Sequence, residues 1–194
     1  MIDYGYGVQL DVLQSEAMDN PIRRWRNEYK VRRVCRQVGL VEEKQQVKWF
    51  ESQSFDPSVN MFLVLIKAKD AAPSRVVGVA GLTNMHSVHR NAELSLYIAP
   101  SEQDGVPPNT GKAIIKTLCS YAFEEMNLNR VFGESFAFNT VAVLNLKDCG
   151  FKNEGVLRQT YYKDGKYTDS IIQSLLRTEY DTIKKDWGFN GHVS

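Results

Sequence analysis

The stretch from Arg130 to Phe151 constrains the fold of this chain more than any other. Arg130 to Phe138 is predicted to be a strand, and Asn139 closes it. The apolar residues that follow recur at helical spacing on one face, namely Ala142, Val143 and Leu146. Gly150 and Phe151 then end the helix, since Gly readily adopts the backbone conformation of a helix end. This stretch therefore predicts a strand that passes directly into a helix.

The remaining elements follow from hydrophobic periodicity and turn signals. Further strands are predicted at Val8–Leu13, Met61–Ala68, Val76–Leu82, Ala92–Ile98 and, around the Asp164-Gly165 turn, Gly155–Tyr162 and Tyr167–Leu176. Helices are predicted around Ile22, Trp25 and Tyr29, at Val41–Ser52 and at Lys112–Met126. Consecutive strands followed by helix-separated strands predict an α/β fold, with a mixed, mostly antiparallel central sheet flanked by helices on both faces.

Length and composition indicate an ordinary globular protein with one domain over residues 1–194. We expect its core to span about residues 8–179 and its tail, residues 180–194, to be a frayed end or a contact with another subunit. The net charge of +1 argues against nucleic acid as a partner. No secretory signal and no membrane-spanning run is visible, and the three cysteines form no paired motif. We therefore expect a cytoplasmic protein with no membrane partner.

The Asn139–Phe151 segment, together with the strand, loop and helix before it, resembles the second half of the GNAT superfamily of acyl-coenzyme A-dependent N-acetyltransferases. The resemblance covers roughly Val8 to Glu179. It implies the same order of elements, acetyl-coenzyme A as cofactor, and a cofactor that lies beside the helix after Asn139. It also implies direct transfer of an acetyl group to a primary amine.

The resemblance places the cofactor pyrophosphate at the loop before the Lys112 helix, where a helix start offers unpaired N–H groups. Pro100 and Gln103 match the family's loop, but Gly105 is out of step and the loop is about two residues longer. The expected cofactor-binding residues here are Gln103, Gly105, Asn109, Thr110, Gly111, Lys112 and Ala113. Pro107 and Pro108 have no N–H, which removes two donors. The alternative is a stiff surface loop, capped by Asn109 or Thr110, that binds no ligand.

The resemblance also places the amide-bearing arm of the cofactor along Leu96, Tyr97 and Ile98, whose backbone would pair with it like an added strand. Asn139 matches a family residue that hydrogen-bonds the cofactor. Asn139 is also a favourable helix N-cap, and the two roles are compatible.

Acyl transfer requires a free-base amine, stabilisation of the developing oxyanion and a proton for the departing thiolate. Glu93 matches a family position for the base, and partial burial would raise the pKa of its carboxyl. The alternative is a strand Glu that pairs with Lys or Arg. Many relatives carry a proton-donating Tyr seven residues after the Asn, where this chain has Leu146. Other candidate donors are Ser95, Tyr97, Asn145 and water, and a non-catalytic acyl-coenzyme A-binding or scaffolding module is the alternative.

The acceptor is expected to bind near the first helices. Trp25-Arg26-Asn27, with Val31-Arg32 and Trp49, resembles the branch that acetylates amino sugars on nucleotide carriers. Seven cations within fourteen residues, Arg23 to Arg36, suit an anionic or nucleotide-linked small-molecule amine. The alternatives are a solvated helix face with Trp25 in the core, and a protein or peptide N-terminus as acceptor. We expect the acceptor to contact Trp25, Arg26, Asn27 and His86. We expect no metal site, and the protein could form a homodimer.

Overall fold

The computed structural model describes residues 1–13, 21–53, 55–66, 74–102 and 104–188. Within these residues the strands are β1 (Val8–Val12), β2 (Asn60–Ile66), β3 (Arg75–His86), β4 (Asn91–Ile98), β5 (Arg130–Phe136), β6 (Lys152–Lys163) and β7 (Lys166–Leu176). The α-helices are α1 (Ile22–Asn27), α2 (Tyr29–Val34), α3 (Glu43–Gln53), α4 (Thr110–Ser120), α5 (Thr140–Asp148) and α6 (Arg177–Ile183). A 3-10 turn, Pro100–Glu102, follows β4, and a π-helical turn, Tyr121–Glu125, continues α4.

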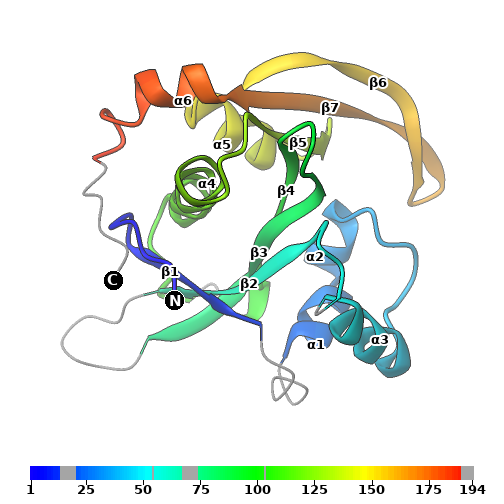
Figure 1. Ribbon diagram of the computed structural model, residues 1–194. Helices are drawn as coiled ribbons and strands as arrows, with labels where there is room; N and C mark the ends of the chain where they lie inside the picture. The colour runs from blue at the N-terminus through cyan, green and yellow to red at the C-terminus, as the bar shows by residue number, and fades with distance from the viewer. Residues whose placement is uncertain (14–20, 54, 67–73, 103, 189–194) are drawn as a thin grey trace.

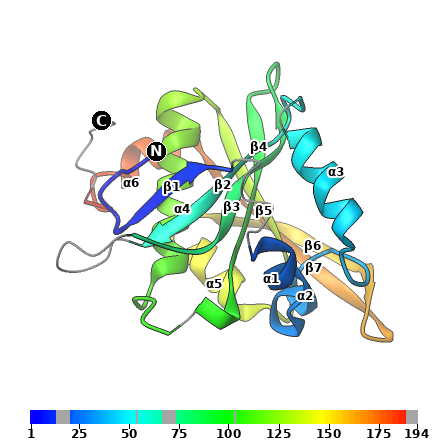
Figure 2. The same ribbon diagram turned by 90° about the horizontal axis from the view of Figure 1, so that it is seen from below.

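The described strands form one sheet in the order β1-β2-β3-β4-β5-β7-β6. All neighbouring pairs are antiparallel except β4 and β5, which are parallel. Figures 1 and 2 show α1, α2 and α3 on one face of this sheet and α4 and α5 on the other. The predicted fold class is therefore confirmed.

Each face of the sheet has its own hydrophobic cluster. The larger cluster packs α4, α5 and α6 on β1 to β5, with Ile114, Leu118 and Tyr180 fully buried. The smaller cluster packs α1 and α3 on the opposite face, around Ile22 and Trp25. Because strand side chains alternate between faces, neighbouring residues of β4 divide between the two clusters.

Three local predictions differ from the structure. The single helix expected around Trp25 is two short helices, because Glu28 adopts an extended conformation (ψ 134°) between them. β3 continues through the polar residues after Leu82 to His86 and pairs there with Asn91. The tail is packed as far as the structure describes it. Trp187 stacks edge-on against Tyr180, with ring centroids 5.5 Å apart.

Cys149 provides a pH test of the larger cluster. Its side chain is 0% exposed, and burial raises the pKa of its thiol from 9.0 to about 11. Since the unfolded chain releases this proton first, the thiol's contribution to stability is complete below pH 9 and is lost as the pH rises to about 11. We expect the free energy of unfolding from urea titrations to fall by up to about 1.4 kcal/mol per pH unit through this group. Cys149→Ala should show a shallower decline, and an unchanged slope would contradict the assignment.

Candidate active site

The parallel pairing of β4 and β5 is short, and this opens the sheet. It runs only from Asn91 opposite Arg130 to Glu93 opposite Phe132. Beyond Glu93 the two strands separate, and in the part of the chain that the structure describes β4 then pairs with β3 alone. A cleft of about 790 Å³ occupies the separation, lined by both strands, by α4 and α5, and by residues of the α1–α3 region.

Two carboxylates lie at the point where the strands separate. Glu93 on β4 is 2% exposed and accepts a hydrogen bond from Asn84 Nδ2 at 2.8 Å. Glu134 on β5 accepts one from Ser170 Oγ at 2.5 Å. Both carboxylates line the cleft, so one bound group could contact both strands at this point.

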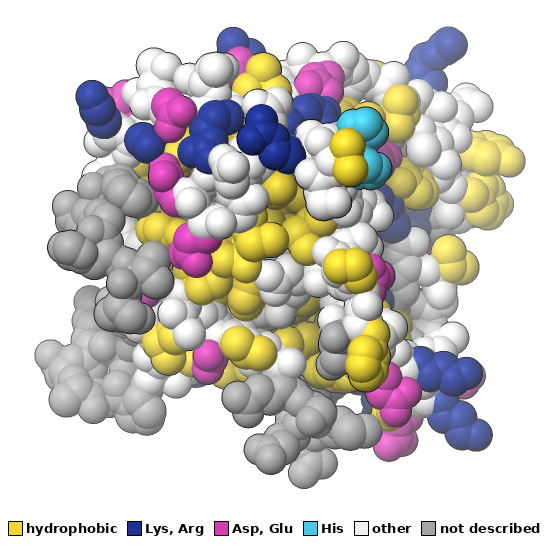
Figure 3. Space-filling view, in the orientation of Figure 1, with side chains coloured by type: hydrophobic (Ala, Val, Ile, Leu, Met, Phe, Trp, Pro, Cys, Tyr) yellow, Lys and Arg dark blue, Asp and Glu magenta, His cyan; other side chains and the backbone are white. Residues whose placement is uncertain are grey.

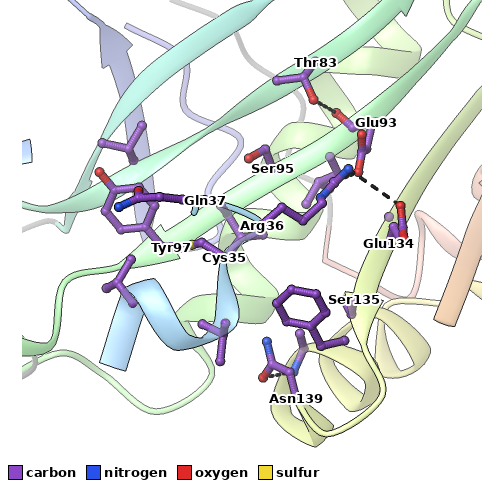
Figure 4. Close-up of a pocket in the computed structure, with 18 of the residues that line it drawn as sticks. Cys35, Arg36, Gln37, Thr83, Glu93, Ser95, Tyr97, Glu134, Ser135 and Asn139 are labelled. Carbon is purple, nitrogen blue, oxygen red and sulfur yellow. Dashed lines mark hydrogen bonds and ion pairs between the residues drawn. The ribbon is translucent and has the colours of Figure 1, made fainter. Parts of the chain in front are cut away.

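A guanidinium lies between these carboxylates. Arg36, from the segment after α2, pairs through Nη2 with Glu93 Oε1, and its Nη1 lies 3.6 Å from Glu134 Oε2. Figure 4 shows the Arg36 side chain reaching across the cleft to the two carboxylates. This ion pair matches the alternative of a strand Glu that pairs with Arg. The role of Glu93 as the base stays a prediction.

The free edge of β4 exposes alternate backbone groups. Ala99 donates its amide to Val77 O of the β3 side at 2.9 Å. Because backbone groups alternate in direction along a strand, Tyr97 also faces β3, whereas Leu96 and Ile98 face the cleft. The predicted set Leu96, Tyr97 and Ile98 is therefore corrected for Tyr97, whose backbone is used within the sheet.

The side chain of Tyr97, in contrast, lines the cleft. Its hydroxyl is buried and has no hydrogen-bond partner among the described residues. Burial raises the pKa of this phenol well above its usual value, so the group stays protonated.

The start of α4 offers two unused backbone donors. Thr110 donates to Pro107 O at 3.3 Å and Ala113 donates to Asn109 O at 3.0 Å, so these two amides are occupied. The amides of Gly111 and Lys112 have no acceptor among the described residues. Asn109, in the left-handed region (φ 69°), makes no side-chain cap that would occupy them. A helix start with free amides suits a phosphate group.

The other predicted residues of this loop differ in their placement. Gly105 has a positive φ of 74° and does not line the cleft. The ammonium of Lys112 pairs with Asp148 of α5 at 3.2 Å, and its contact with the cofactor stays a prediction. Gln103 lies outside the described residues. Periodicity and spacing could not predict the Lys112–Asp148 ion pair, because its two residues come from distant parts of the chain.

Asn139 and Leu146 form the α5 side of the cleft. Asn139 caps α5, its Oδ1 accepting from the Ala142 amide at 3.5 Å. Leu146 is 4% exposed and packs closely on Gly133 of β5, where an added Cβ would lie 3.0 Å from Leu146 Cδ1. This position is apolar and cannot donate a proton.

The predicted acceptor residues are separated by the fold. Trp25 is 1% exposed in the smaller cluster, and the Asn27 side chain is hydrogen-bonded to both backbone groups of Val41. His86 stacks on His89 with centroids 4.1 Å apart, and Figure 3 shows the two imidazoles together at the surface. None of these three predicted residues is among the described residues that line the cleft, and their contact with the acceptor stays a prediction. Arg26 does line it, with its guanidinium 5.6 Å from the Trp49 ring centroid.

Several residues that line the cleft were not predicted as site residues. Among them are Arg36, Trp49, Glu134 and Tyr161. Burial raises the pKa of Tyr161, and the Arg36 guanidinium beside it opposes that rise. Arg36 was noted only as part of the cationic run. Glu134 carried a signal, since a charged residue in a strand that also holds Val131, Phe132 and Phe136 needs a partner when it is buried.

Residues 16–172 match the model of the acetyltransferase (GNAT) domain family, which is more than half of the chain. The protein belongs to the GNAT family. It is an acetyl-coenzyme A-dependent N-acetyltransferase, as the sequence resemblance predicted, and the alternative of a non-catalytic module is set aside.

Individual relatives differ in their named substrates. The spermidine N(1)-acetyltransferase of Vibrio cholerae serotype O1 is 28% identical over 145 residues, covering 68% of this chain and 80% of that protein. YdaF of Bacillus subtilis, provisionally named a ribosomal N-acetyltransferase, is 33% identical over 111 residues, covering 55% and 57%. The crystal structure of Vibrio cholerae spermidine N-acetyltransferase with CoA and spermine has a TM-score of 0.80 at 21% identity, covering 90% of this chain and 98% of that one. This structural likeness supports the GNAT fold of this protein.

The described residues contain no helix long and apolar enough to cross a membrane. They also contain no group of three or more His, Cys, Asp or Glu side chains arranged to hold a metal ion.

Proposed function

We propose that this GNAT enzyme acetylates a primary amine of a small cationic acceptor of the polyamine type. The observation that carries the proposal is the pair of carboxylates, Glu93 and Glu134, at the point where the free edge of β4 begins. An ammonium between them would be charge-compensated next to the strand edge that suits the acyl donor. The relatives named for spermidine acetylation support the same acceptor class.

The residues around the cleft fit coenzyme A. Bound acetyl-coenzyme A would supply the acetyl group as a thioester. Among the described residues, the cleft-facing backbone groups of Leu96 and Ile98 have no partner and suit the amides of its arm, and the amides of Gly111 and Lys112, likewise without an acceptor there, suit its pyrophosphate. Asn139 also lines the cleft.

Glu93 is the proposed base. An alkyl ammonium has a pKa near ~10, so a carboxylate or a water relay must assist its loss of a proton. The Leu96 amide would stabilise the developing oxyanion. Because Leu146 cannot protonate the thiolate, the hydroxyls of Ser95 and Tyr97, which line the cleft, are the proposed donors. A thiolate of pKa ~8.5 is also a fair leaving group without one.

The test is a thiol-release assay with acetyl-coenzyme A and three acceptor classes: spermidine, a nucleotide-linked amino sugar, and a peptide with a free N-terminus. We expect spermidine to give a kcat/KM at least about tenfold above the others, the factor that about 1.4 kcal/mol of selective binding provides. A preference for either of the other acceptors would reject the polyamine proposal.

A nucleotide-linked amino sugar is the second candidate, and one observation favours it. A second hollow of about 370 Å³ adjoins the cleft and is lined by Arg32 and Arg33. Neither has an acidic partner among the described residues, and the buried Nε of Arg32 has no hydrogen-bond partner there. Such arginines suit a phosphate. We rank this candidate second because the carboxylates lie nearer the expected reaction centre.

Variants of Asn139 can separate its two roles, as the N-cap of α5 and as a proposed contact with coenzyme A. Asn139→Ala removes both the cap and the contact with coenzyme A, whereas Asn139→Asp keeps a good cap but loses the amide N–H donors. We expect both variants to weaken coenzyme A binding about tenfold in calorimetry, as one lost hydrogen bond of about 1.4 kcal/mol would. Only the Ala variant should lose about 1 kcal/mol of stability. Full affinity in Asn139→Asp would limit Asn139 to the cap.

A further inference from the structure

Arg36 lies where the proposed acceptor should bind. Its guanidinium contacts Glu93 and lies 3.6 Å from Glu134, and these are the two acceptors proposed for the substrate ammonium. The carboxylate side chains are 3% and 13% exposed, whereas the Arg36 side chain is 43% exposed. The cation is therefore the solvent-facing member of this group, and the carboxylates are fixed in the sheet.

An ammonium and the guanidinium need the same oxygen atoms. Both are donors without acceptor atoms, and Glu93 and Glu134 are the anionic groups that the described residues of the cleft offer them. Asn84 donates to Glu93 Oε2 and Ser170 to Glu134 Oε1, and Arg36 faces the other oxygen of each carboxylate, so every carboxylate oxygen already has a donor beside it. Two adjacent cations would also repel each other. An incoming ammonium must therefore displace Arg36.

The segment that carries Arg36 is held mainly by polar contacts. Lys163, from the end of β6, donates to the carbonyl oxygens of Cys35 and Gln37 at 2.8 and 2.7 Å. Two apolar side chains that follow face solvent, since Val38 is 92% and Leu40 is 62% exposed. A segment with little apolar burial and a few polar anchors opens at low free-energy cost.

We propose that Arg36 is an internal competitor for the acceptor-ammonium site and thereby determines which amines the enzyme accepts. The proposal rests on the proposed function, because it assumes that an ammonium binds between Glu93 and Glu134. Acceptors with several ammonium groups would displace Arg36 more readily than a monoamine. If Arg36 occupies the site nine-tenths of the time, the apparent affinity for an amine is about tenfold below its intrinsic value.

The test compares Arg36→Gln with the wild type in steady-state kinetics with spermidine and with propylamine. We expect Arg36→Gln to lower KM for both amines, by about tenfold for propylamine, with kcat within about twofold. Arg36→Lys keeps the charge and should stay within about threefold of wild type. Arg23→Gln is the matched control, since Arg23 is exposed on α1 and lies outside the cleft lining; its KM should not change.

A second variant leaves Arg36 and the two carboxylates unchanged. Lys163→Gln loosens the Arg36 segment without removing Arg36, and it should lower KM in the same direction. Thermal unfolding of every variant checks that it is folded. If wild type turns over amines and neither Arg36→Gln nor Lys163→Gln lowers KM, the competitor role is rejected and the proposed function stands. If neither wild type nor Arg36→Gln turns over either amine, the polyamine function itself fails, and this inference fails with it.

Discussion

Replacing Glu93 by Gln is expected to lower kcat about 100-fold, the lower end of the usual contribution of a general base. Gln keeps the size of the side chain and can still accept from Asn84, whose Nδ2 lies 2.8 Å from the carboxylate. It cannot take a proton from the acceptor amine. The affinity for coenzyme A should be unchanged in calorimetry, because the proposed cofactor contacts lie further along β4 and at α4.

Two further variants test whether the fall in kcat is specific to Glu93. Glu51→Gln removes a carboxylate from the exposed face of α3 and should have wild-type kinetics. Glu134→Gln should mainly raise KM, since Glu134 is proposed to bind the ammonium and not to accept its proton. An unaltered kcat in Glu93→Gln would remove Glu93 from the mechanism and leave it as the ion-pair partner of Arg36.

Replacing Trp25 by Ala is expected to lower the free energy of unfolding by about 3–5 kcal/mol, as for other buried aromatic side chains. Trp25 is 1% exposed and packs with Ile22, Phe50 and Val79 between α1, α3 and the sheet. The corresponding fall in Tm is roughly 10 °C for a chain of this size. Thermal and urea unfolding measure both quantities.

Trp25→Phe is the matched variant, because it keeps an aromatic ring in the cluster. It should recover most of the lost stability, and the loss of its indole N–H should cost little, since Nε1 has no partner among the described residues. Stability within about 0.5 kcal/mol of wild type in Trp25→Ala, the range typical of a surface substitution, would contradict the core assignment. If Trp25→Ala also raised the KM for the acceptor strongly, this would support the predicted contact between Trp25 and the substrate.

Sequence reasoning succeeded where local patterns decide structure. The apolar run from Met61 and the alternation from Ala92 to Ile98 gave strands close to β2 and β4. Asn139 and the helix after it were predicted correctly, because an N-cap and helical periodicity are properties of a few adjacent residues. The division at Glu28 was missed, since a contact with Ser101, 73 residues away, accompanies the extended conformation there.

By itself, the sequence determined the α/β class, the order of strands and helices, the GNAT resemblance and Glu93 as a candidate. Only the tertiary structure decided that Trp25, Asn27 and His86 lie outside the cleft and that Arg36 and Glu134 lie inside it. The physical reason is the distance along the sequence between residues that come into contact. Periodicity reports which face of its own element a residue occupies, whereas an ion pair between Arg36 and Glu93 joins residues 57 positions apart once the sheet has formed.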